Sequence, residues 1–206
     1  MSDKLYLYPV WIRLWHLCNA LLFILLIITG LSMQYSSPEQ PLIRFDYAVS
    51  IHNICGILLT ANYFFFFIGN LVTTNGKYYK TSIRGIFDRL MIQFRYYTIG
   101  IFKGAKAPFP INKERKFNPL QQFTYVVAMY VFLPLIFISG WALLFPELLF
   151  NRLIGVSGLR INDFIHIVTS FLASIFMFVH IYFCTIGSTF ISSFRSMING
   201  YHDTHD

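Results

Sequence analysis

Four apolar stretches of about 20 residues constrain this chain more than any other feature of its sequence. They cover approximately residues 12–33, 49–72, 123–145 and 164–187. A helix of about 20 apolar residues crosses the roughly 30 Å hydrocarbon core of a bilayer, and it satisfies its own backbone hydrogen bonds there. The sequence therefore predicts an all-α integral membrane protein in which four transmembrane helices form a bundle.

The composition agrees with a membrane location. Only 12% of the residues are charged and 56% are hydrophobic, whereas soluble domains carry about 25% charged residues. A net charge of +7 would suit a nucleic-acid partner if the protein were soluble. Here the basic residues gather in one loop between apolar stretches. We therefore expect no nucleic-acid partner, and we treat residues 1–206 as one membrane domain.

The loops between the apolar stretches differ sharply in positive charge. The stretch 73–122 contains ten of the 16 Lys and Arg residues, whereas the loops 34–48 and 146–163 together contain three. Loops rich in Lys and Arg remain on the cytoplasmic side of a membrane. We therefore expect both termini and the long loop in the cytoplasm, where the loop can also contact anionic membrane lipids.

The long basic loop carries a helical pattern of its own. Ile86, Leu90, Phe94 and Tyr97 recur near a helical period, and Gly104 and two prolines interrupt the pattern afterwards. Apolar residues on one face of a basic helix are typical of a helix that lies on a membrane surface. The sequence predicts an interfacial helix in this loop.

Four of the six histidines lie inside the apolar stretches, at His16, His52, His166 and His180. Ionisable side chains at this depth are costly and usually mark function. His166 and His180 are 14 residues apart, which places them about 21 Å apart along one helix and within about 40° of the same face. One helix therefore presents a ligand near each membrane surface.

The expected topology pairs the histidines by depth. His16 and His180 lie near the cytoplasmic face, whereas His52 and His166 lie near the outer face. Each level has two histidines and no carboxylate, which does not suit zinc but suits the axial ligands of haem iron. We therefore expect two b haems inside the bundle, one at each level. Copper binding and proton relay are alternative interpretations.

Small residues fit the same interpretation. Gly30 shares a face with His16 but lies at the outer level, where a glycine lets a porphyrin lie against the backbone. Helix packing through small residues is the alternative. The segments 27–30 and 137–140 look alike, and each ends a stretch that leads into a histidine-bearing one. They suggest a faint two-helix repeat.

Haem propionates are anionic and need cationic partners near each surface. The candidate propionate partners are Arg13 and Lys116 at the inner level, and Arg44 and Arg160 at the outer level. The alternative for each of them is that it sets the membrane topology or contacts lipid.

With these features, the chain resembles the cytochrome b subunits of bacterial respiratory oxidoreductases: thiosulfate reductase, formate dehydrogenase (gamma subunit) and nickel–iron hydrogenase. The resemblance covers nearly the whole chain. Besides the four histidines, it rests on Pro9–His16 at the start of the first stretch, Ile28–Leu31 at its end, and Phe117–Gln122 before the third.

The resemblance implies a quinone site beside the cytoplasmic haem, for menaquinone or ubiquinone. Transferred to this chain, the site consists of His180, Asn118 and Gln121, with Lys116 nearby. Polar groups at this boundary offer donors to the quinone carbonyls and a proton path to water. The alternative is that Asn118 and Pro119 only cap the third helix.

We therefore expect an electron-transfer subunit of a respiratory oxidoreductase in the bacterial inner membrane, rather than a complete enzyme. It would connect the quinone pool to an iron–sulfur subunit and a catalytic subunit at the outer face. A second hypothesis is a stand-alone di-haem cytochrome that oxidises superoxide or another small reductant and reduces quinone. A third is a haem-free transporter or assembly anchor that uses its histidines for protons or metal.

Overall fold

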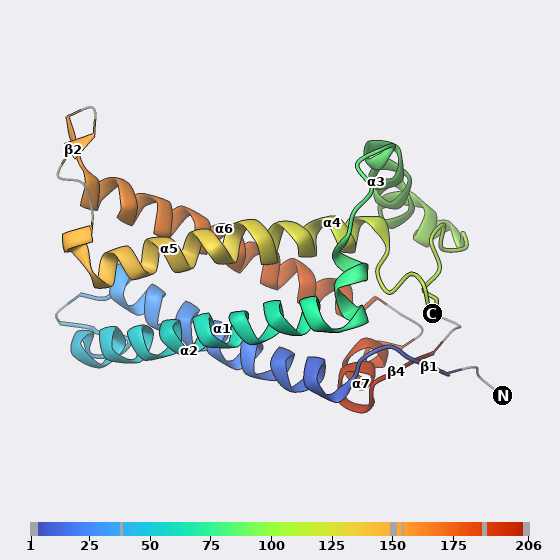
Figure 1. The fold of residues 1–206 in the computed structure, drawn as a ribbon, viewed down its shortest axis with the longest axis horizontal. Coiled ribbons are helices and arrows are strands. Elements are labelled where there is room, and N and C mark those ends of the chain that lie inside the picture. Colours follow the sequence, from blue (N-terminus) through green and yellow to red (C-terminus); the bar gives the residue numbers. More distant parts are fainter. Residues whose placement is uncertain (1–3, 38, 149–151, 154, 187–188, 204–206) are drawn as a thin grey trace. The chain divides into compact units, whose positions relative to one another are not determined.

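Four long helical segments dominate the structure, a computed structural model that describes residues 4–37, 39–148, 152–153, 155–186 and 189–203 (Figure 1). The segments are α1 (Val10–Tyr35), α2 (Phe45–Val72), a composite helix Pro119–Leu144, and α6 (Gly158–Cys184). Each is long and apolar enough to cross a membrane. The predicted all-α membrane architecture is confirmed.

The helices begin before the apolar stretches do, because polar residues cap or form their first turns. The clearest case is α4 (Pro119–Val127), which begins earlier than the predicted residue 123. Asn118 Oδ1 accepts the backbone N–H of Gln121, and Gln121 Oε1 accepts the backbone N–H of Asn118. This capping box stabilises the first turn. The capping role considered for Asn118 and Pro119 is therefore confirmed. The predicted end of the fourth stretch at Gly187 lies outside the described residues.

The third membrane segment is not a regular α-helix. After α4 comes a π-helical turn, η4 (Ala128–Phe132), and then α5 (Leu133–Leu144). Pro134 has no N–H to donate to the preceding turn, and its ring crowds that turn, so a wider turn is favoured there. Turns of this kind are frequent at functional sites.

The long helices expose their apolar side chains. Within the most apolar window of each membrane segment, between 11% and 28% of the residues are buried. Leu14 and Leu21 on α1, and Phe171 and Phe178 on α6, are all more than half exposed. A helix on a soluble protein would turn such residues towards a core. Here lipid is the solvent for these faces.

The chain divides into two compact units. The first, which we call the helical unit, consists of Trp11–Ile68 and Phe132–Ile175. The second, which we call the loop unit, consists of Met1–Val10, Gly69–Val131 and Phe176–Asp206.

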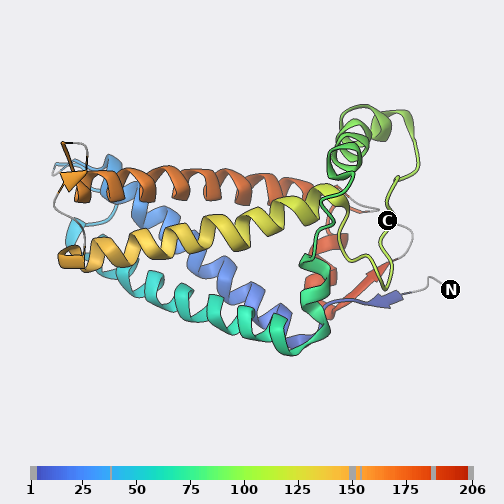
Figure 2. The same cartoon turned by 45° about the horizontal axis from the view of Figure 1, so that its top comes forward.

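In the helical unit, portions of α1, α2, α5 and α6 lie side by side (Figures 1 and 2). Trp15 of α1 stacks on Phe66 of α2 with ring centroids 4.2 Å apart. Tyr63 of α2 contacts Phe137 of α5 at 5.1 Å. A short 3-10 turn, η5 (Pro146–Leu148), follows α5. An antiparallel pair, β2 (Arg152–Leu153) and β3 (Val156–Ser157), precedes α6.

The loop unit joins both ends of the chain to the long basic loop. β1 (Lys4–Tyr6) pairs antiparallel with β4 (Tyr201–Asp203), which follows α7 (Ser192–Asn199). The unit also contains α4. The remaining elements of the loop are η1 (Thr74–Tyr79), α3 (Ile86–Arg95), the π turn η2 (Tyr96–Gly100) and η3 (Ile101–Lys103).

The helix predicted in the long loop is present as α3, which packs beside α4. Ile86, Leu90 and Tyr97 are half-buried, whereas Phe94 is 54% exposed. Phe87 is 71% exposed, so α3 also shows an apolar outer face. This face supports the predicted position at a membrane interface.

Candidate functional site

His52 and His166 face each other in the helical unit. They lie on α2 and α6, both are half-buried, and their ring centroids are 6.4 Å apart with the planes at 71°. Two imidazoles that bind one metal ion from opposite sides, with bonds of about 2 Å, place their centroids roughly 6 Å apart. The structure therefore brings this predicted pair together at a spacing that fits a shared iron.

A hydroxyl group faces the Nδ1 atom of each of these histidines. Thr29 Oγ1 lies 2.9 Å from His52 Nδ1, and Ser139 Oγ lies 2.9 Å from His166 Nδ1. Thr29 is on α1 and Ser139 is on α5, one residue before a glycine in each case. The sequence analysis did not single out these hydroxyls, although the similarity of segments 27–30 and 137–140 was the signal that could have found them.

The two glycines lie against the imidazole rings. A Cβ added at Gly30 would lie 3.6 Å from His52 Cε1, and one at Gly140 would lie 3.2 Å from His166 Cε1. Gly30 was expected to lie against a porphyrin, but in the structure it lies against the ring of His52. A Cβ at Gly30 would make an ordinary van der Waals contact with that ring, whereas one at Gly140 would crowd the ring of His166.

His180 lies in the loop unit, surrounded by aromatic side chains. Its Nδ1 is 3.2 Å from the Tyr125 hydroxyl, and its ring stacks on Phe176 with centroids 6.0 Å apart. The thiol of Cys184, one turn later, is 3.8 Å from Nε2. A contact of that length is weak, so Nε2 can exchange it for a metal. Tyr125 was not identified from the sequence.

His16 lies on α1 in the helical unit and is half-buried. Within one turn of it, Trp15 Nε1 and Asn19 Oδ1 are buried and have no hydrogen-bond partner among the described residues. Buried polar atoms normally have partners. The Trp15 N–H could donate to an anionic group such as a haem propionate beside His16, whereas Asn19 Oδ1 only accepts and needs a donor. Because His16 and His180 lie in different units, their pairing stays a prediction.

The three candidate arginine partners have different surroundings. Arg13 is half-buried and lies one turn before His16. Arg44 forms an ion pair with Asp46 at 2.8 Å, and both side chains are more than half exposed. Arg160, in the first turn of α6, is exposed and has no partner within the described part of the chain. Arg44 is therefore already paired, whereas Arg160 retains its charge for another anion.

The residues expected at a quinone site lie where α4 begins. Asn118 is engaged on both sides of its amide, because its Oδ1 caps the helix and its Nδ2 donates to the Tyr97 hydroxyl at 2.8 Å. Gln121 uses its Oε1 in the capping box. Its Nε2 has no hydrogen-bond partner in the part of the chain that is described, so this donor remains available. The Tyr97 ring also contacts Phe183, near the end of α6, at 4.7 Å.

Lys116 is buried, with 2% of its surface exposed. Its Nζ donates to Asn75 Oδ1 at 3.1 Å and lies 4.6 Å from the centroid of the Tyr8 ring. The rings of Tyr78 and Phe117 also face it. Burial lowers the pKa of Lys116 from its usual 10.5 to about 8. An aromatic cage can stabilise the ammonium, but it replaces only part of the lost hydration.

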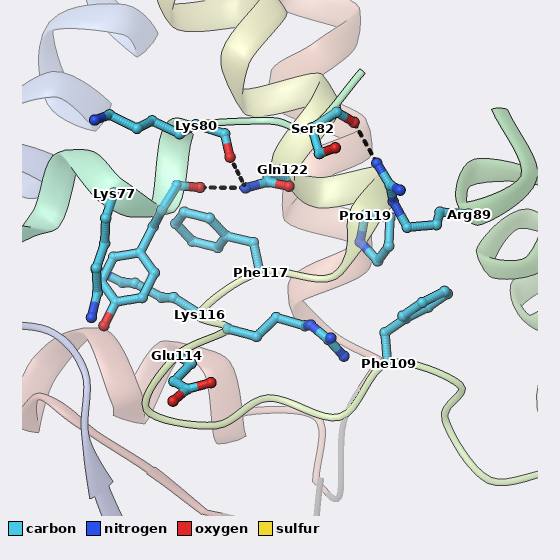
Figure 3. A pocket seen from close by; sticks show the side chains of 12 residues that line it. Lys77, Lys80, Ser82, Arg89, Phe109, Glu114, Lys116, Phe117, Pro119 and Gln122 are labelled. Carbon is cyan, nitrogen blue, oxygen red and sulfur yellow. Dashed lines mark hydrogen bonds between the residues drawn. The ribbon is translucent and has the colours of Figure 1, made fainter. Parts of the chain in front are cut away.

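A pocket of about 280 Å³ opens in the loop unit next to this lysine (Figure 3). Gln122 Nε2 forms one wall by donating to the backbone oxygens of Tyr78 and Lys80. Five Lys or Arg residues line the pocket, against the single acid Glu114. This charge balance favours phosphate-bearing anions. The basic lining residues are Lys77, Lys80, Arg89, Arg115 and Lys116.

Nowhere in the described residues do three His, Cys, Asp or Glu side chains gather in a way that could hold a metal ion. A zinc site needs at least three protein ligands. The two-histidine arrangement of His52 and His166 instead needs a metal whose other ligands come from elsewhere. A porphyrin supplies four nitrogens to its iron and leaves two axial positions for the protein.

Comparisons with known proteins agree with this chemistry. The family model for prokaryotic cytochrome b561 matches residues 7–200. A relative from Escherichia coli (strain K12), "Putative cytochrome YdhU", is 38% identical over 201 residues, which cover 98% of this chain and 76% of the relative. The chain therefore belongs to the prokaryotic cytochrome b561 family, a family of multi-pass membrane proteins that bind b-type haem and transfer electrons. The family resemblance found in the sequence is confirmed.

The depressed pKa of Lys116 predicts a pH-dependent stability. Between about pH 8 and 10.5 the folded chain has released this proton, whereas the unfolded chain still binds it. The free energy of unfolding should therefore rise with pH across this window, on the order of 1–3 kcal/mol. Lys116→Met should lack that rise. Thermal unfolding of both proteins in detergent from pH 7 to 10 measures it, and parallel pH profiles would contradict the prediction.

Proposed function

We propose that this member of the prokaryotic cytochrome b561 family holds two b haems and carries electrons across the membrane, between the quinone pool and a partner at the outer face. Haem iron, when bound, accepts and donates single electrons. The observation that carries the proposal is the His52–His166 pair, whose rings are 6.4 Å apart on neighbouring helices. The chain's contribution is to hold these ligands at fixed positions in a medium that excludes water.

His52 and His166 are the ligands proposed for the outer haem. His52 is seven residues after the start of α2 at Phe45, and His166 is eight after the start of α6 at Gly158. At 1.5 Å per residue, each ligand is about 11 Å from the end of its helix. Arg160, exposed in the first turn of α6, is the cation available to a propionate at this level.

His16 and His180 are the ligands proposed for the inner haem. Tyr125 supports His180 through the contact to its Nδ1. On α1, the unpartnered Trp15 Nε1 can donate to a propionate, and Arg13 can offset its charge. The spacing of His166 and His180 on α6 supports two haem levels, because a single haem has no use for ligands about 21 Å apart along one helix.

Quinone is proposed to bind on the cytoplasmic side, at the start of α4. A quinone carbonyl needs a hydrogen-bond donor, and Gln121 Nε2 is a donor without a partner in the described chain. Asn118 orders the site through the capping box and the Tyr97 hydroxyl. The Tyr97 and Phe183 rings, 4.7 Å apart, offer an apolar surface for the quinone ring. Either menaquinone or ubiquinone has this chemistry.

An iron–sulfur subunit, with a catalytic subunit beyond it, is proposed as the partner at the outer face. The outer ligands lie close to the ends of α2 and α6, so a partner that docks there can reach the outer haem. The distribution of positive charge supports an inner-membrane location with both termini in the cytoplasm. The basic lining of the pocket in the loop unit supports contact with anionic lipids on that side.

The di-haem proposal predicts which histidines act together. His52→Ala and His166→Ala should each remove the same single haem, and the double variant should lose no more. His16→Ala and His180→Ala should each remove the other haem. Haem per polypeptide and the α-band of the visible spectrum, measured on detergent-purified chains, report this. If each of the four variants lost haem partially and independently of the others, the pairing would be contradicted. Wild-type protein that binds no haem, even when produced in cells supplied with haem, would overturn the proposal.

The quinone proposal predicts a selective effect at Gln121. Gln121→Glu keeps an oxygen for the capping box but removes the amide donor. Reduction of the haems by a quinol analogue should slow by roughly 3–10-fold, the value of one lost hydrogen bond. Haem content and thermal stability should be unchanged. Gln121→Met, which loses the capping oxygen as well, is the matched control and should also lower stability. An unaltered quinol rate in Gln121→Glu would count against this site.

A further inference from the structure

The two hydroxyl–histidine contacts in the helical unit determine which ring nitrogen carries the proton. Thr29 Oγ1 donates to the Leu25 carbonyl at 2.7 Å, and Ser139 Oγ donates to the Leu135 carbonyl at 2.6 Å. A hydroxyl has only one proton to donate. Once that proton is used, the oxygen can only accept from the histidine. Each contact therefore requires a proton on Nδ1.

The same contacts decide which nitrogen of each ring remains for a metal. In neutral imidazole, a proton on Nδ1 leaves the lone pair on Nε2. Both histidines are thus held in the form that binds metal through Nε2.

The hydroxyls are shielded from competing partners. Thr29 is 1% exposed and Ser139 is 2% exposed, so bulk water cannot replace either contact. Gly30 and Gly140, the next residues, lie against the same imidazole rings, and a Cβ at Gly140 would crowd the ring of His166. The same hydroxyl–glycine pair therefore occurs twice, once opposite each histidine. A single occurrence could be incidental packing, but two with equal 2.9 Å contacts indicate a shared role.

We propose that Thr29 and Ser139 are positioning residues that fix His52 and His166 as Nδ1–H tautomers and tune the midpoint potential of the haem they share. A hydrogen bond from the second nitrogen of a ligating histidine raises the basicity of the first and orients the ring. A more basic axial ligand favours the oxidised iron and so lowers the potential. This inference rests on the proposed function, because it assigns a role toward the outer haem.

The test compares removal of each hydroxyl with its conservative replacement. Thr29→Val and Ser139→Ala remove the hydroxyl, whereas Thr29→Ser and Ser139→Thr keep it. The full chain is purified in detergent, its haem content is measured, and its visible spectrum is titrated against potential. Removal of either hydroxyl should raise the midpoint potential of one haem and weaken its retention by about 10-fold. The other haem should be unchanged, and the conservative variants should resemble the wild type.

His52 and His166 themselves remain in these variants, so we expect a shifted potential rather than loss of the ligands. Unchanged potentials in both Thr29→Val and Ser139→Ala would overturn the inference, as would equal shifts in the variants that keep a hydroxyl. If one removal variant does not fold, the other tests the same claim on the opposite histidine. Wild-type protein without haem would instead overturn the proposed function, which separates the two failures.

Discussion

An imidazole at hydrocarbon depth needs a partner for each of its ring nitrogens, and this requirement organises the functional part of the structure. The Thr29 hydroxyl accepts from Nδ1 of His52, and the Ser139 hydroxyl accepts from Nδ1 of His166. Nε2 then remains for a ligand that the protein does not supply. Because lipid offers no hydrogen bonds, the family's b-type haem is the natural partner for that nitrogen. The glycines beside the hydroxyls lie against the same rings.

The surroundings of His52 and His166 are a duplicated arrangement. Thr29, Gly30 and His52 in the first half of the chain correspond to Ser139, Gly140 and His166 in the second. The faint repeat seen in the sequence is thus matched by equal contacts. His180, in the loop unit, has a different partner, because the phenol of Tyr125 faces its Nδ1.

Much of the fold could be predicted from the sequence because lipid imposes long apolar helices, and the rarity of ionisable residues made the four histidines conspicuous. The partners of those histidines could not be predicted in the same way. A contact such as Thr29–His52 depends on the rotation of two helices about their axes, which apolar length does not specify. Asn118 is a different case. The three-residue spacing of Asn118 and Gln121 in the sequence is compatible with a helix cap and with a quinone contact. The structure shows that the helix cap is formed, as a capping box.

The central claim is that the chain holds two haems whose surroundings differ. The most direct measurement is a redox titration of the visible spectrum of the unmodified, detergent-purified chain, with haem quantified per polypeptide. We expect two low-spin b haems with two separate midpoint potentials, because hydroxyls face His52 and His166 and a phenol faces His180. A single haem, or two with identical behaviour, would contradict the proposed arrangement of ligands.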